Sequence, residues 1–150
     1  MPEKETLERA EEDKKEGKAP STQAGEFVRE EIEHVREGKH GARSTKQAIA
    51  IGLSKARRAG VPVKPPKKGS AAAASRESAH KATRAGRSKP SAKSSPKRAK
   101  AVRHALEREG RAAGSKPALA KQARAAARKR SPAERSAAAR KAAATRKKRK

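Results

Sequence analysis

The sequence predicts a mostly α-helical and intrinsically disordered chain, with a short N-terminal helical hairpin followed by a basic low-complexity tail with induced helices. Residues 64–150 hold 29 Lys or Arg, four Glu and 26 Ala, but only three larger apolar residues. Residues 21–63 hold most of the large apolar side chains, and the 150-residue chain has one Phe and no Cys. The apolar surface of the tail is too small to offset the entropy of ordering it, so disorder is expected there.

Residues 1–20 are predicted to be an acidic, solvated leader with helical tendency. Glu5 and Arg9 stand four residues apart in the order that stabilises a helix. Leu7 is the only large apolar side chain of this stretch. Because one such side chain buries little surface, no firm docking of the leader is expected.

A first helix is predicted over residues 23–37. Val28, Ile32 and Val35 recur at helical spacing and form one apolar stripe. Ser21 or Thr22 is expected to cap its start and Gly38 to end it. The other face is acidic and is expected to face solvent: Glu26, Glu30, Glu33 and Glu37.

A second helix is predicted over residues 45–59, opened by a Ser44–Gln47 capping box and stopped by Gly60 and Pro62. A glycine inside a helix costs about 1 kcal/mol against Ala, so Gly52 indicates close approach of the first helix. A hairpin over residues 21–63 follows, with these packing residues: Val28, Ile32, Val35, Ile49, Gly52 and Leu53. Its small core favours dimerisation or ordering on a protein partner.

The tail, residues 64–150, contains three candidate helices that a polyanion would induce. Ser95-Pro96 and Pro117 suit the first turn of two of them. Ser131 and Glu134 form a capping box ahead of the third.

The tail carries a net charge of +25 of the chain's +26, so its expected partner is nucleic acid, most simply double-stranded DNA. Phosphate neutralisation carries no sequence information. The predicted function is therefore sequence-independent DNA binding and compaction. The candidate contact residues are Lys46, Lys55, Arg57, Arg58, Lys64, Lys67, Lys68, Lys97, Arg98, Lys100, Arg103, Lys121, Arg124, Arg128, Lys129, Arg130, Arg140, Lys141, Arg146, Lys147, Lys148, Arg149 and Lys150.

Two alternatives stay open. Phosphate binding does not distinguish DNA from RNA, so an RNA- or ribosome-associated protein fits the same tail. A protein-interaction adaptor that acts through residues 21–63 fits the hairpin. Base-reading modules are disfavoured, because the chain lacks stacking aromatic residues, zinc-finger spacing and the third helix of a helix-turn-helix core.

Catalysis, cofactors, metals and membranes are not predicted. Nothing apolar surrounds Glu30, Glu31 and Glu33 in sequence, and no nucleophile motif appears. The four histidines show no ligand spacing and are expected to be solvated: His34, His40, His80 and His104. The tail lacks the bulky apolar anchors of an interfacial helix, and the acidic N-terminus is unlike a signal peptide, so a cytoplasmic location is expected.

Two resemblances extend this interpretation. The stretches AKQARAAARKR and SAAARKAAATRKKRK resemble the Ala/Lys/Pro-rich tails of linker histone H1 and of bacterial histone H1-like nucleoid proteins. Ser95-Pro96-Lys97-Arg98 is similar to the Ser-Pro-basic-basic turns of linker-histone tails. Residues 26–61, EFVREEIEHVREGKHGARSTKQAIAIGLSKARRAGV, resemble a module of small, basic, uncharacterised bacterial proteins. These resemblances imply a bacterial source and a nucleoid location, with residues 146–150 as DNA contacts.

Overall fold

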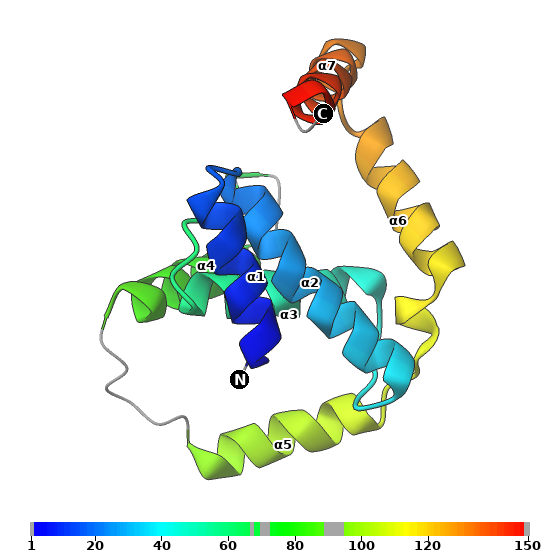
Figure 1. Cartoon of the computed structure of the whole chain (residues 1–150). Helices are drawn as coiled ribbons and strands as arrows, with labels where there is room; N and C mark the ends of the chain where they lie inside the picture. Colours follow the sequence, from blue (N-terminus) through cyan, green and yellow to red (C-terminus); the bar gives the residue numbers. More distant parts are fainter. Residues whose placement is uncertain (1, 67, 70–72, 89–94, 149–150) are drawn as a thin grey trace. The chain divides into compact units, whose positions relative to one another are not determined.

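Helices cover most of the chain in the computed structural model, which describes residues 2–66, 68–69, 73–88 and 95–148. Within these ranges lie seven α-helices and one 3₁₀ turn, η1 (Figure 1): α1 (Lys4–Lys15), α2 (Pro20–Glu37), α3 (Thr45–Arg58), α4 (Ala73–Arg87), α5 (Pro96–Glu107), η1 (Ala112–Gly114), α6 (Lys116–Arg128) and α7 (Pro132–Lys148). The prediction of a mostly disordered chain is therefore wrong. Ala, Lys and Arg are strong helix formers, and a count of large apolar residues neglects that propensity.

The chain divides into two compact units, an N-terminal unit of residues 1–115 and a C-terminal unit of residues 116–150. In the N-terminal unit, α2 contacts α1 and α3, and α3 contacts α4. Figure 1 shows α1 and α2 side by side, with α3 crossing behind them. None of the helices in the described ranges combines the length and apolar content that crossing a bilayer requires.

The two helices predicted over residues 23–37 and 45–59 are confirmed as α2 and α3. Gly38 ends α2 with a φ of 78°, a left-handed conformation that favours glycine. The start of α2 differs from the prediction, because Pro20 opens the helix and Ala19 precedes it without a side-chain cap. Ser44 caps α3 by accepting a hydrogen bond from the amide of Gln47 (3.2 Å), as predicted.

Close contact between α2 and α3 occurs at Gly52, as the sequence indicated. A Cβ atom there would lie 2.6 Å from the Cα of Val28. Of the six predicted packing residues, Val35 and Gly52 are buried, whereas the other four are partly buried: Val28, Ile32, Ile49 and Leu53.

Small residues and Phe27 make up much of the buried apolar core. One cluster joins Ala10, Ala24, Phe27 and Ala56, and partly buried Leu53, Val61 and Val63 pack against it. In addition, α4 buries Ala79 and Ala82. Gly86 on the same face would collide with the carbonyl of Arg57 if it carried a Cβ. Helices lined by such small side chains approach closely, so buried area comes from backbone contact as well as from side chains.

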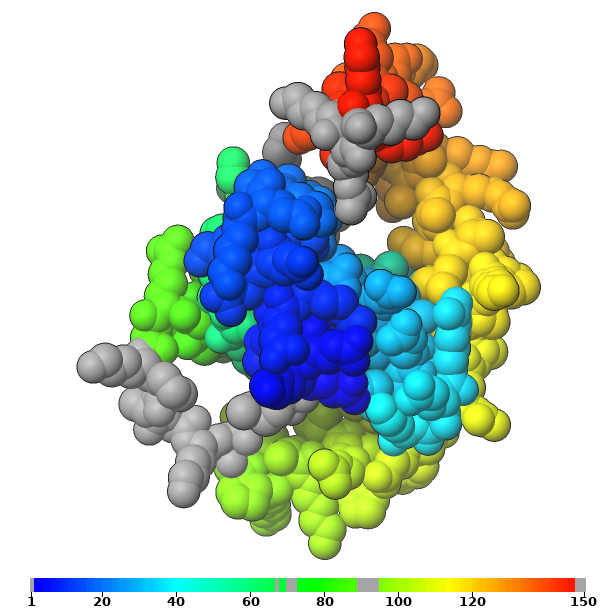
Figure 2. Space-filling model, viewed as in Figure 1, coloured from blue at the N-terminus to red at the C-terminus, as the bar shows by residue number. Residues whose placement is uncertain are grey.

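The leader is docked, contrary to the expectation for residues 1–20. The side chains of Thr6 and Ala10 on α1 are buried against the rest of the unit. The backbone amide of Glu3 donates a hydrogen bond to Glu30 (3.1 Å), and Arg9 pairs with Glu26 (3.1 Å). Figure 2 shows the atoms of α1 lying directly against those of α2. These polar contacts and the burial of Ala10 in the core hold α1, whereas its single leucine is exposed.

Residues 106–114 make a second set of unexpected contacts, with the loop of residues 38–44 and with both hairpin helices. The amides of Gly41 and Ala42 donate to the carbonyls of Leu106 (2.9 Å) and Gly110 (3.1 Å). The hydroxyl of Thr45 donates to the carbonyl of Ala113 (2.7 Å), and Arg36 Nε donates to Gly114 (2.7 Å). A second core cluster lies beneath them: Val35, Ala42, Ala48 and Ala113.

The C-terminal unit consists of α6 and α7. The predicted capping box is confirmed, because the Ser131 amide donates to Glu134 Oε2 (2.8 Å) and the Glu134 amide donates to Ser131 Oγ (3.2 Å). Every side chain of α7 that the structure describes is exposed. This helix therefore rests on its capping and on its Ala, Lys and Arg content.

Candidate nucleic-acid interface

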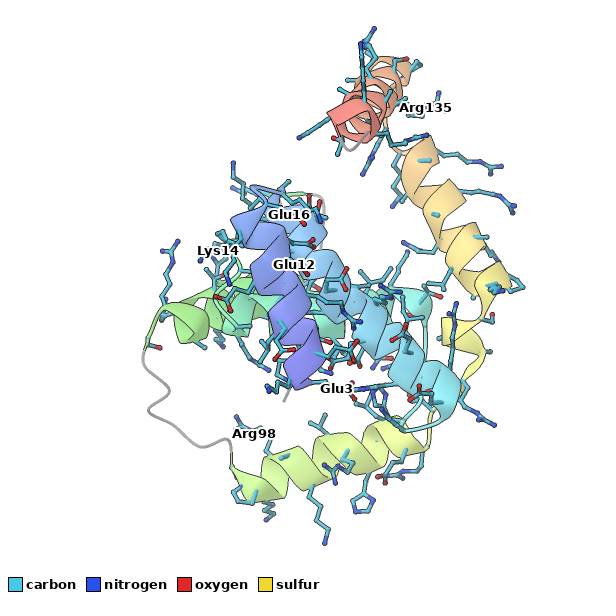
Figure 3. All side chains as sticks on the ribbon, in the orientation of Figure 1. Glu3, Glu12, Lys14, Glu16, Arg98 and Arg135 are labelled. Carbon is cyan, nitrogen blue, oxygen red and sulfur yellow. The ribbon has the colours of Figure 1, made fainter. Side chains whose placement is uncertain are left out.

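Exposed cationic side chains dominate the C-terminal unit. Its 35 residues contain 14 Lys or Arg and one acidic residue, Glu134, a net charge of +13. Every Lys and Arg side chain described between residues 116 and 147 is exposed. Figure 3 shows nitrogen-tipped side chains extending from α6 and α7, with Arg135 labelled on α7. Since Glu134 serves in the cap of α7, most of this positive charge faces solvent.

The cations are arranged differently on the two helices. On α6, Lys121, Arg124 and Arg128 follow i, i+3, i+7 spacing and therefore share one face. On α7, Arg140 and Lys147 share one face through i, i+7 spacing, whereas Lys141 and Arg146 fall on other sides of the helix. A phosphate backbone that lies along either helix would meet several cations within the reach of Lys and Arg side chains.

The remaining predicted contact residues fall into three groups. Eight are exposed cations of the N-terminal unit, four of them on α5: Lys46, Arg58, Lys64, Lys68, Lys97, Arg98, Lys100 and Arg103. Lys129 and Arg130 are exposed beyond the end of α6. Lys67, Arg149 and Lys150 lie outside the described residues, and the side chain of Lys148 does also.

Lys55 is partly buried, with its side chain 20% exposed, and belongs to an ionic cluster with two buried carboxylates. Its ammonium lies 2.9 Å from Glu30 Oε1 and 2.8 Å from Glu31 Oε2, and these carboxylates are 2% and 1% exposed. Burial disfavours the charge on Lys55, but its contacts with Glu31 and Glu30 together outweigh this effect and raise the pKa of Lys55. Burial likewise acts to raise the pKa of Glu30, but Lys55 and the Glu3 amide lower it overall. The predicted solvated acidic face is therefore wrong at Glu30.

Arg57 is also occupied within the fold. Arg57 is 7% exposed, and its guanidinium donates hydrogen bonds to the carbonyls of Val63 and Lys64, both at 3.3 Å. The side chain thereby fixes the turn that follows α3. Arg57 and Lys55 are thus internal to the N-terminal unit and are not part of its exposed cationic surface.

The histidines fall into two pairs. His80 and His104 are exposed, as expected. The same prediction is wrong for His34 and His40, whose side chains are 14% and 16% exposed. Their ring centroids lie 6.0 Å apart, and the rings are nearly perpendicular.

Glu31, His34 and His40 form a cluster that the sequence analysis missed. One potential ligand atom from each residue lies within 4.8 Å of those of the other two. The available signal was the Glu-x-x-His spacing of Glu31 and His34, which places both on one helix face. His40 has no such signal, because the turn at Gly38 brings it back toward α2.

Residues 4–68 match the model of a family of unknown function (DUF6496). This match spans α1, α2 and α3 and includes the module of residues 26–61. No curated protein and no solved structure matches the chain.

Proposed function

We propose that this protein binds double-stranded DNA without reading its sequence, and compacts it, through the exposed cations of α6 and α7 with a contribution from α5. The proposal rests on the composition of the C-terminal unit. This unit contains 14 Lys or Arg and one Glu, and its described cations are exposed. Lys and Arg neutralise phosphates and release condensed counterions, which supplies affinity independent of sequence. A nucleoid-associated role similar to that of histone H1-like tails follows from this mechanism.

The charge balance of residues 1–63 supports assigning DNA binding to α5, α6 and α7. Residues 1–63 contain 12 acidic and 13 basic side chains. Several of these acids pair with cations of the same region, as in the contacts of Glu3 with Lys39 and of Asp13 with Lys18. An acidic surface that is matched by its own cations neither attracts DNA strongly nor competes for the C-terminal cations.

The proposal predicts a steep salt dependence that resides in α6 and α7. For about ten phosphate contacts, affinity for a random-sequence duplex should fall about 10⁵-fold between 50 and 200 mM salt. Replacing four cations by Gln should lower the slope of log affinity against log salt by about three to four. Gln keeps the helices because its helix propensity is high. The variant carries Lys121→Gln, Arg124→Gln, Arg128→Gln and Arg140→Gln, and fluorescence anisotropy measures the binding.

A matched control removes four exposed cations from α1 and α2: Lys4→Gln, Lys14→Gln, Lys15→Gln and Arg29→Gln. Both variants lose the same net charge, but the control removes it from the charge-balanced region, where Lys4, Lys15 and Arg29 form exposed ion pairs. The control should keep nearly the wild-type slope. Equal loss in both variants would show that net charge alone drives binding. A structured RNA that competes better than the duplex would move the function to RNA.

A further inference from the structure

The Glu31 carboxylate is buried between the Lys55 ammonium and the ring of His40. Glu31 is 1% exposed, and neither of its oxygens accepts a hydrogen bond in good geometry from the described residues. Oε2 lies beside the ammonium of Lys55 (2.8 Å), whereas Oε1 lies 3.3 Å from Nε2 of His40. Oε1 is therefore a buried anionic oxygen directed at an imidazole nitrogen.

The contact made by Nδ1, the other nitrogen of His40, determines whether Nε2 directs a hydrogen or a lone pair at Glu31. Nδ1 lies 3.0 Å from the carbonyl oxygen of Gly41, which accepts but does not donate, so Nδ1 carries a hydrogen. In the neutral imidazole Nε2 then presents a lone pair to the carboxylate. Two acceptors that face each other at this distance need either a proton, which would make His40 an imidazolium, or a metal cation between them. A backbone carbonyl on the far nitrogen is also how proteins orient histidine ligands of metals.

We propose that Glu31, His34 and His40 bind a divalent transition-metal ion of the Zn²⁺ class. Metal–nitrogen and metal–oxygen bonds of about 2.0–2.2 Å in a tetrahedral site place ligand atoms about 3.3–3.5 Å apart. The His40–Glu31 separation of 3.3 Å already fits this geometry, and the three ligand atoms lie within 4.8 Å of one another. Two imidazoles and one carboxylate suit Zn²⁺, whereas Mg²⁺ and Ca²⁺ prefer oxygen ligands.

The surrounding charges fit a site of three protein ligands. The Lys55 ammonium lies 2.8 Å from Oε2 of Glu31, whereas Oε1 is the oxygen that faces His40 and would bind the metal. Glu3 lies 2.9 Å from His34 Nε2 and orients that ring from the start of α1, where Figure 3 labels it. The ion would join α2 to the loop of residues 38–44, on which residues 106–114 rest.

The test is titration of the full-length wild-type chain with Zn²⁺ against a competing chromophoric chelator, in buffer free of nucleic acid. We expect one equivalent to bind. His40→Ala should weaken binding by about 100-fold or more, because loss of an outer-shell partner alone costs about 10–100-fold. His80→Ala, at an exposed histidine of α4, is the matched control and should bind as the wild type does.

Spectroscopy of the wild type keeps the test independent of whether a variant folds. When Co²⁺ is added, hyperfine-shifted imidazole signals should come from His34 and His40 but not from His80 or His104. Failure of the wild type to bind one equivalent, shifted signals from other histidines, or equal affinity of folded His40→Ala and His80→Ala would each overturn the site. None of these outcomes depends on DNA binding, so this proposal and the proposed function fail separately.

Discussion

Gly52 sets how closely α2 and α3 approach each other. A Cβ at this position would lie 2.6 Å from the Cα of Val28 and 2.9 Å from the carbonyl oxygen of Phe27. Both atoms are backbone and cannot rotate away, so the two helices would have to separate. The mid-helix glycine therefore costs helix propensity in return for backbone contact.

Gly52→Ala should destabilise the N-terminal unit by about 1–3 kcal/mol, the usual cost of overpacking, despite the gain in helix propensity. Gly25→Ala is the matched control, because Gly25 also lies inside a helix but has open space at its Cβ position. It should stabilise the unit by about 1 kcal/mol. Urea unfolding followed by the NMR signals of α2 and α3 measures both. Stabilisation by Gly52→Ala would contradict the close approach of the helices.

At the scale of elements, the loop of residues 38–44 holds residues 106–114 through backbone hydrogen bonds. Gly41 permits this contact, because a Cβ there would collide with the carbonyl of Glu109. The collision would separate the Gly41–Leu106 and Ala42–Gly110 hydrogen bonds. The contact requires the absence of a side chain at Gly41, so a single substitution there can disrupt it.

Gly41→Ala should release residues 109–114 at a cost of about 1–3 kcal/mol, since each of the two hydrogen bonds contributes about 0.5–1.5 kcal/mol. Amide hydrogen exchange at Ala42 and Gly114 reports the release. Gly110→Ala alters the same segment, but open space surrounds its Cβ position, so protection should persist there. Unchanged exchange in Gly41→Ala would show that this contact does not hold the segment.

Local signals made α2 and α3 predictable, whereas the contacts between distant segments were not. Gly38, Ser44 and Gly60 mark helix ends through backbone conformation and capping, which depend on near neighbours alone. The docking of α1 and of residues 106–114 depends instead on hydrogen bonds between residues far apart in sequence. A count of large apolar residues also underestimated a core that contains many alanines.

The candidate sites divide in the same way. Exposure of the α6 and α7 cations follows from composition, since nothing in those helices offers an equal number of acids. The burial of Lys55 and Arg57 was not predictable, because each pairs with groups that only the fold brings together. For the cluster of Glu31, His34 and His40, the sequence could indicate only the pair of Glu31 and His34, through their Glu-x-x-His spacing on one helix.

At the scale of the whole molecule, charge is balanced in one region and concentrated in another. Residues 1–63 carry a net charge of +1, whereas residues 116–150 carry +13. Like charges four residues apart on a helix, such as Arg124 and Arg128, each cost about 0.2–0.5 kcal/mol. The buried contacts of Lys55 with Glu30 and Glu31 are of opposite sign and shielded from the solvent. The two regions should therefore respond differently to salt.

Raising NaCl from 50 mM to 1 M shortens the Debye length to about 3 Å and screens the repulsion along α6 and α7. Amide protection in these helices should increase about threefold to tenfold, which corresponds to relief of a few like-charge pairs. Protection in α2 and α3 should change little, because buried pairs are screened weakly. Hydrogen exchange measured by NMR at constant pH follows both regions in one sample. Sucrose, which is uncharged and stabilises folded structure generally, is the control and should raise protection in both. A salt response of equal size in α3 and α7, or a loss of protection in α7, would contradict the charge separation as the cause.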